Sequence, residues 1–235
     1  AGYKVDVIAG RGGDFANGVK FRHLEEVDSR HPEVLVVGKE LADGRVSSRF
    51  ENLRDRLVEK LRATLVPSQT CIVHNALSLH KNLPLTAALK ILNDQNSLHI
   101  LAWCHDFAWL DPLYTPQLHP GYPWDLLRQA WRGVKYVAVS RYRRDLLADL
   151  LGIQPQTISV VTPGVDVFSF LDLDSQVQEL VRKLDLLHAA PLLLLPARIT
   201  RRKNIQFAIR VVAELKILAP QAALLITGPP GAHNP

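Results

Sequence analysis

A cluster of four cations follows an apolar run late in the chain and precedes a helical pattern. The apolar run, Leu192 to Pro196, is typical of a buried strand, and the amphipathic pattern from Ile205 to Leu218 is typical of a helix. Positive charge beside a helix N-terminus is unfavourable to the helix dipole, whereas a bound anion would face free backbone N–H groups and the cations together. We therefore predict an anion site, with a solvated basic loop as the alternative. The cations are Arg198, Arg201, Arg202 and Lys203.

A histidine and an aspartate follow another strand-like run. His105 and Asp106 come directly after the run His99 to Cys104. A histidine at the carboxyl end of a strand can hydrogen-bond a substrate hydroxyl or move a proton. A structural histidine with a local partner is the alternative. A metal site that adds His74 and Cys104 to this pair lacks the spacing typical of zinc ligands, so we expect no metal.

The segment TPGVD, from Thr162 to Asp166, directly follows the strand-like run Thr157 to Val161. Because Pro163 fixes one backbone dihedral and Gly164 frees the next, the pattern predicts a sharp turn. Turns at the carboxyl ends of strands in open α/β sheets are where ligands bind. Taken alone, the segment is better explained as a simple surface turn.

Two segments near other strand ends are weaker candidates. The glycine-rich segment RGGDFANG, Arg11 to Gly18, does not have the Walker pattern, so a flexible loop is its default interpretation. The segment Val73 to Leu85 offers His74, Asn75 and Lys81. These side chains either line a cleft or belong to a plain connection between a strand and a helix.

Strand-like and helical patterns alternate along the chain, which predicts an α/β fold built on parallel sheets. Most strand-like runs are continuously apolar, as expected of strands covered on both faces. Ser140 is placed to cap the helix that begins at Arg141, and Gly152 stands where that helix should end. The expected strands are Tyr3 to Ala9, Glu33 to Val37, Cys71 to His74, His99 to Cys104, Tyr136 to Val139, Thr157 to Val161, Leu192 to Pro196 and Ala222 to Thr227. The expected helices are Arg49 to Leu65, Leu83 to Leu92, Arg141 to Leu151, Ser175 to Leu187 and Ile205 to Leu218.

The chain is long enough for two modest domains. It has 235 residues, and the segment Asp166 to Asp174 reads as a linker. We place the boundary near Phe168, which gives an N-terminal domain over 1–167 and the start of a second over 168–235. The chain contains no methionine and both ends read as interrupted elements, so we expect it to be part of a longer protein.

Composition favours a soluble protein with anionic partners. Hydrophobic residues make up 47% and charged residues 22%, and the net charge is +5. No basic tract or motif typical of nucleic-acid binding is present, and no apolar run approaches a membrane span. Cys71 and Cys104 lie in apolar runs, where buried reduced thiols are the favoured state and a disulfide remains the alternative.

Three segments taken together resemble GT-B glycosyltransferases of the retaining class known as family four, or "group 1". The segments are YVAVSRYRRDLLADLLGI, ISVVTPGVDVFSF and LLLLPARITRRKNIQFAIRVVAEL. The family's strand ending in serine is matched by Val139-Ser140, and its proline–asparagine–glycine–valine–aspartate pattern by Pro163 to Asp166, with threonine–proline in place of proline–asparagine. Its Gly-Arg and later lysine are matched by Ala197-Arg198 and Lys203.

The resemblance implies two Rossmann-like domains and the transfer of a sugar from a nucleotide diphosphate sugar, with retention of the anomeric configuration. It implies that Arg198 and Lys203 bind the donor diphosphate and that His105 contacts the sugar or acceptor. It also implies four further residues near the substrate: Ser140, Asp106, Gly164 and Asp166. No cofactor or metal is implied.

The resemblance also implies what is missing. The N-terminal domain lacks the family's first strand, and the second domain is only partly present, without the family's later glutamate pair. The isolated chain is therefore expected to be inactive or nearly so, whereas the parent protein would be the enzyme. Two alternatives remain: a non-catalytic α/β module that binds a phosphorylated ligand or a protein partner, and a phosphorylase or hydrolase of sugars.

The expected partners are a nucleotide-sugar donor and a carbohydrate, lipid-linked or small-molecule acceptor. A cytoplasmic location is expected. Five arginines near one helix leave two interpretations, peripheral contact with an anionic inner membrane surface or a solvated helix face, and we favour the second. These are Arg128, Arg132, Arg141, Arg143 and Arg144.

Overall fold

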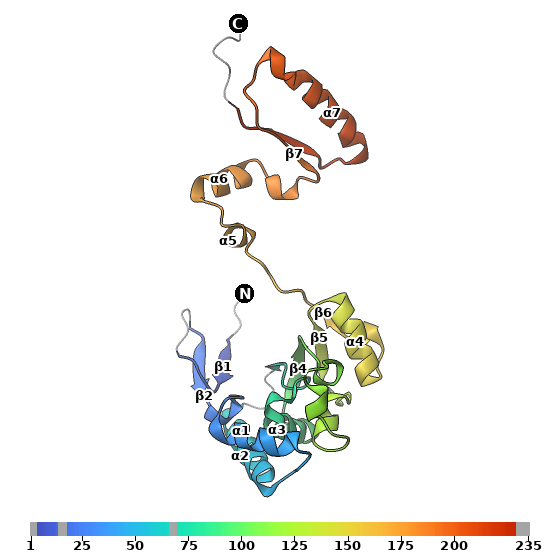
Figure 1. Cartoon of the computed structure of the whole chain (residues 1–235). Helices are drawn as coiled ribbons and strands as arrows, with labels where there is room; N and C mark the ends of the chain where they lie inside the picture. The colour runs from blue at the N-terminus through green and yellow to red at the C-terminus, as the bar shows by residue number, and fades with distance from the viewer. Residues whose placement is uncertain (1–3, 14–17, 66–69, 229–235) are drawn as a thin grey trace. The chain divides into compact units, whose positions relative to one another are not determined.

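The computed structural model describes residues 4–13, 18–65 and 70–228 (Figure 1). Contacts divide the chain into two compact units, 1–163 and 164–235. The sequence placed this boundary between residues 167 and 168. Part of the glycine-rich candidate loop, Tyr3 at the start of an expected strand and the last seven residues lie outside the described ranges.

The first unit contains two parallel sheets, as its alternating patterns predicted. A two-stranded sheet pairs β1 (Asp6–Ala9) with β2 (Lys20–His23). A four-stranded sheet has the order β3-β4-β5-β6, and all its neighbours are parallel. Its strands are β3 (Thr70–His74), β4 (His99–Cys104), β5 (Lys135–Ala138) and β6 (Ser159–Val160).

In the described part of the first unit, four α-helices and several single 3₁₀ turns lie between these strands. The helices α1, α2 and α3 lie together in Figure 1, and α2 and α3 pack against each other. The α-helices are α1 (Pro32–Ala42), α2 (Ser48–Thr64), α3 (Leu83–Asp94) and α4 (Arg141–Leu151). The 3₁₀ turns are η1 (Glu25–Val27), η2 (His80–Asn82), η3 (Ala108–Leu110), η4 (Thr115–Gln117), η5 (Trp124–Leu127) and η6 (Pro155–Thr157).

The core of the first unit forms between the helices and one face of the four-stranded sheet. Four leucines at a spacing of four residues suggest the helix α2 in the sequence; of these, Leu53, Leu57 and Leu61 are buried, whereas Leu65 follows the helix and is only partly buried. Each buried leucine contributes about 2 kcal/mol by leaving water. Val73 on β3 is buried as well, whereas its neighbour Ile72, on the opposite face of the sheet, is 55% exposed. The helices therefore cover one face of β3 and leave the other open.

Two expectations for the first unit were wrong. The segment Glu33 to Val37 is helical, within α1, because Pro32 starts the helix and Val34, Val37 and Leu41 repeat at helical spacing and are buried. The short apolar run had suggested a strand. The sequence also missed β2, a short and mostly exposed strand with no continuous apolar run.

The second unit contains a two-stranded parallel sheet, β7 (Leu192–Leu195) with β8 (Ala223–Ile226), beside which α7 (Ile205–Leu218) runs in Figure 1. Two short helices precede it, α5 (Val167–Phe170) and α6 (Ser175–Lys183). The helix expected over Ser175 to Leu187 ends at Lys183, and the turn η7 (Leu186–His188) follows it. The turn η8 (Arg201–Lys203) leads into α7.

None of the helices within the described ranges combines the length and the apolar character that crossing a bilayer requires.

Candidate functional site

The carboxyl ends of β3, β4 and β5 bring several candidate residues to one edge of the sheet. His74 ends β3 and pairs in register with Trp103 on β4. His105 and Asp106 follow β4, and Ser140 follows β5. Parallel strands put their carboxyl ends at the same edge, which is where open α/β sheets bind ligands.

The imidazoles of His74 and His105 lie side by side at this edge. Their ring centroids are 5.8 Å apart, and the His74 ring also stacks on Trp103 at 5.6 Å. Desolvation of His74 and repulsion from the His105 imidazole lower the pKa of His74 from its ordinary value. The neutral imidazole is thereby favoured at His74, and a neutral imidazole can both donate and accept a hydrogen bond.

Asn75 joins the end of β3 to the residue that follows β4. Its side-chain Oδ1 accepts a hydrogen bond from the backbone N–H of His105 at 2.7 Å. Its own backbone N–H donates to the carbonyl of Trp103 at 2.9 Å. The sequence named Asn75 only as a weak candidate, and nothing in the sequence indicated this contact between residues in separate strand ends.

Asp106 and Ser140 meet at the first turn of α4. Asp106 Oδ1 is 3.3 Å from a guanidinium nitrogen of Arg143, and both side chains are exposed. Ser140 Oγ accepts the Arg143 backbone N–H at 3.1 Å, which confirms Ser140 as the cap of α4. Sequence reasoning missed Arg143 as a partner of this site. Through its contact with Asp106, the guanidinium of Arg143 places a positive charge near the carboxyl end of β4.

The alternative metal site does not assemble around Cys104. That thiol is 1% exposed, and its Sγ contacts the carbonyl oxygen of Ala102 at 3.7 Å. Within the described ranges, no three side chains of the metal-binding types gather closely enough to hold an ion. Both cysteines are free thiols, so the disulfide alternative is wrong.

The turn expected at Thr162 to Asp166 is also wrong. Residues 161–166 form no turn, and Gly164 does not adopt a left-handed conformation. A Cβ added to Gly164 would meet no atom within 4 Å. The conformation therefore does not require glycine here. Asp166 is exposed and caps α5 by accepting the backbone N–H of Phe168 at 3.0 Å and of Ser169 at 3.3 Å.

The second unit holds the four predicted cations between β7 and α7. All four are exposed, and among the described side chains none of them has an ion-pair partner. The residue before α7, Asn204, is left-handed with φ 48° and makes no side-chain capping bond. The first turn of α7 thus has no side-chain cap to satisfy its backbone N–H groups. The four cations are Arg198, Arg201, Arg202 and Lys203.

Gly228 is a residue of this region that sequence reasoning missed. It follows β8, and a Cβ added to it would lie 2.0 Å from the carbonyl oxygen of Ala197 and 2.5 Å from the backbone nitrogen of Arg198. Only glycine fits this contact, because a Cβ cannot approach backbone atoms so closely. The glycine after the apolar run Ala222 to Thr227 was the available signal.

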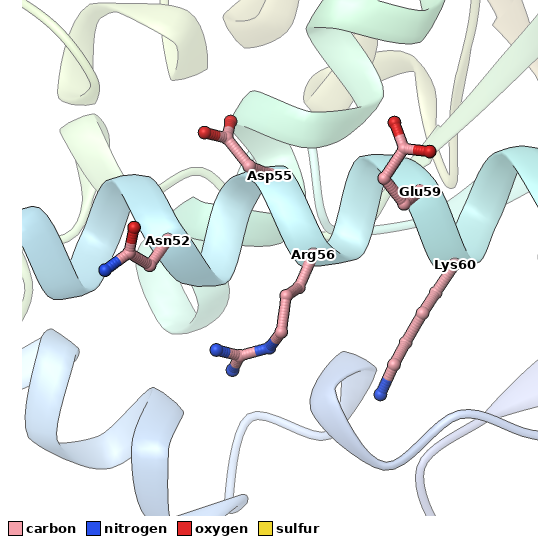
Figure 2. A pocket seen from close by; sticks show the side chains of 5 residues that line it. All are labelled: Asn52, Asp55, Arg56, Glu59 and Lys60. Carbon is pink, nitrogen blue, oxygen red and sulfur yellow. The ribbon is translucent and has the colours of Figure 1, made fainter.

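A shallow hollow along α2 is a less suitable site. Figure 2 shows Arg56 and Lys60 pointing to one side of the helix and Asp55 and Glu59 to the other. Arg56 is ion-paired with Glu33, and Lys60 is ion-paired with the buried Glu26. Burial alone would raise the pKa of Glu26, but the hydrogen bond and charge of Lys60, a backbone hydrogen bond and the charge of Arg56 together lower that pKa. The cations of this hollow are therefore already neutralised. It is lined by Asn52, Asp55, Arg56, Glu59 and Lys60.

Comparison with known proteins adds no assignment: no family model matches this chain, and no curated protein is significantly similar to it.

Proposed function

We propose that the chain belongs to a retaining glycosyltransferase that moves a sugar from a nucleotide diphosphate sugar to an acceptor. The observation that carries the proposal is the set of exposed cations between β7 and α7, which make no ion pair with any other described side chain. A diphosphate brings two negative charges to these cationic side chains, and its negative charge grows as the bond to the sugar breaks. Arg198 and Lys203 would bind the diphosphate and stabilise that charge.

The second part of the proposal concerns the sheet edge in the first unit. His105 would contact the transferred sugar or the acceptor, next to His74 at 5.8 Å. Asp106 and Ser140 would contribute polar groups at the same edge. An imidazole there can hydrogen-bond a sugar hydroxyl in either direction while it is neutral.

The proposed fold is GT-B, with a Rossmann-like domain in each unit. Such a domain places a further parallel strand beside β3, which is an edge strand in the described sheet. The 55% exposure of Ile72 supports a further covering element, such as the helix of a strand–helix–strand crossover, because parallel sheets are normally covered on both faces.

The first experiment measures binding by thermal shift with UDP-, GDP- and ADP-glucose. We expect one of the three to raise the melting temperature, since a ligand at 100 times its Kd adds about 2.7 kcal/mol of stability. Arg198→Ala and Lys203→Ala should abolish the shift. Arg210→Ala, which removes an exposed cation from the body of α7, is the matched control and should keep it.

The second experiment uses the longer parent protein, since the isolated chain is expected to be inactive, and follows release of the nucleoside diphosphate from the donor found above. Arg198→Ala should slow turnover by about 3 kcal/mol of transition-state stabilisation, as removal of one oxyanion donor does elsewhere. Equal turnover in Arg198→Ala and in the unsubstituted protein would show that Arg198 has no part in the mechanism. With a glycan in place of the nucleotide sugar, release of free sugar in water would identify a hydrolase, and release of sugar phosphate in the presence of phosphate would identify a phosphorylase.

A non-catalytic module is the second candidate function. The same cations support it, because they would bind any phosphorylated ligand. A shift with pyrophosphate in a protein that responds to no nucleotide sugar would favour this module over the enzyme.

A further inference from the structure

Asn75 makes contacts beyond the end of the β3–β4 ladder. The last register pair of these strands is His74 with Trp103. One residue later, the Asn75 backbone N–H donates to the Trp103 carbonyl at 2.9 Å, and its Oδ1 accepts the His105 N–H at 2.7 Å. The backbone N–H of His105 lies beyond the paired part of β3 and therefore donates to the Asn75 side chain instead of to a strand carbonyl.

The backbone of Asn75 is itself fixed. It adopts a left-handed conformation with φ 57°, which asparagine tolerates better than most residues. Its carbonyl accepts the backbone N–H groups of Ser78 at 3.0 Å and Leu79 at 2.8 Å. With its N–H, carbonyl and side chain all engaged, Asn75 has little freedom to move.

His105 depends on this contact more than its neighbours do. Cys104 is still held in the sheet by its pairing with Ala138 on β5, and His105 is the first residue past that ladder. The His105 ring lies against the His74 imidazole. A shift of the His105 backbone would therefore move the ring relative to His74 and to anything bound beside them.

We propose that Asn75 is a positioning residue that holds His105 in place at the carboxyl edge of the sheet. The inference rests on the proposed function in so far as His105 contacts the sugar or acceptor. Asn75 itself need not touch the substrate. Its acceptor oxygen fixes the backbone that carries the imidazole, and misplacement of a substrate-contacting group by about 1 Å can cost about 100-fold in rate.

Two substitutions separate this role from that of a simple turn residue. Asn75→Gly keeps the left-handed backbone and removes the acceptor oxygen, whereas Asn75→Asp keeps an acceptor oxygen at the same position. The matched control is Asn96→Gly, at another left-handed asparagine, which has φ 55° and lies just after α3, away from the site.

The decisive measurement is NMR of the His105 backbone amide and imidazole, which needs no donor or acceptor. We expect Asn75→Gly to speed exchange of the His105 amide by about fivefold to tenfold, the worth of one hydrogen bond. The His105 imidazole resonances should shift as well. Asn75→Asp should keep the protection of that amide, and Asn96→Gly should leave it unchanged.

Unaltered protection of the His105 amide in Asn75→Gly would overturn the proposal, as would an equal change in Asn96→Gly. Turnover gives the second readout, with a fall in kcat of about 10- to 100-fold expected for Asn75→Gly, and partial recovery in Asn75→Asp. A longer parent protein with the expected NMR changes but no transfer activity would overturn the proposed function, while the hydrogen bond from Asn75 would stand.

Discussion

The two cysteine thiols differ in how far water reaches them. Cys104 is 1% exposed, and burial raises its pKa to about 12, against a smaller opposing effect of a hydrogen bond with Ser78. Cys71 is partly buried, and burial raises the pKa of its thiol too. Because the thiolate is the reactive form, both are slower than a free cysteine, and Cys104 is the slower of the two.

We expect a disulfide reagent such as DTNB at pH 8 to label Cys71 first and to reach Cys104 only when the protein unfolds. Labelling followed at 412 nm should therefore show two separate phases, with the second absent from Cys104→Ser. In Cys71→Ser, the remaining thiol should react at the rate of unfolding. Labelling of Cys104 in the native protein at the rate of Cys71 would contradict its burial.

Single residues of the site could be predicted only in part from the sequence. His105 was identifiable because it follows an apolar run, and the end of such a run becomes a sheet edge. The bond between Asn75 and His105 was not, since it depends on the register of two strands that are far apart in the sequence. The Gly228 contact with Ala197 has the same origin, because it requires β7 and β8 to pair.

Glycines in two helical settings should respond oppositely to the same substitution. Gly152 ends α4 with φ 65°, whereas Gly38 lies inside α1 without a positive φ. A Cβ would meet no atom within 4 Å at either position, so steric contact does not decide the outcome. The backbone conformation does.

We expect Gly152→Ala to destabilise the protein by about 1 kcal/mol, the cost of a left-handed L-residue. Gly38→Ala should stabilise it by about 0.5–1 kcal/mol, because alanine loses less backbone entropy on folding. Urea unfolding midpoints of the two variants measure this. Midpoints that move in the same direction would show that the backbone conformation at these two glycines does not determine the effect of the substitution on stability.

Two helices, α4 and α7, were predicted at the residues where the structure begins and ends them. Ser140 and Gly152 fixed α4 at the residues where the structure begins and ends it. The leucine spacing also predicted α2 correctly, because Leu53, Leu57 and Leu61 on one face of the helix reach the core. The first part of α1 failed because its valines favour a strand locally, and packing of Val34, Val37 and Leu41 on one face overrides that preference.

The two units of the chain differ in how much apolar surface they bury. The continuous core described above belongs to the first unit. In the described part of the second unit, the buried hydrophobic residues are Val212 and Ala222, while Leu194, Phe207 and Ile217 are each at least 60% exposed. Local stability follows buried apolar contact, so the second unit should open more readily.

Hydrogen exchange followed by mass spectrometry tests this difference. We expect the amides of β7 and β8 to exchange well before those of β4 and β5, under conditions in which α2 stays protected. The helix α4, which has both of its caps but lies at the edge of the first unit's core, provides an internal reference. Equal protection of β7 and β4 would show that the second unit is held by more than its described core.

The order of strands in the four-stranded sheet has a consequence for how the chain folds as it is made. Each strand from β4 to β6 pairs with the strand synthesised just before it. Each added strand closes one crossover segment onto an edge that already exists, and the entropic cost of closing a loop grows only slowly with its length. On the ribosome, the sheet can therefore grow in one direction, with β4, β5 and β6 added in turn to an edge that already exists. The two-residue strand β6 is then both the last to emerge and the first that a shortened chain would lose.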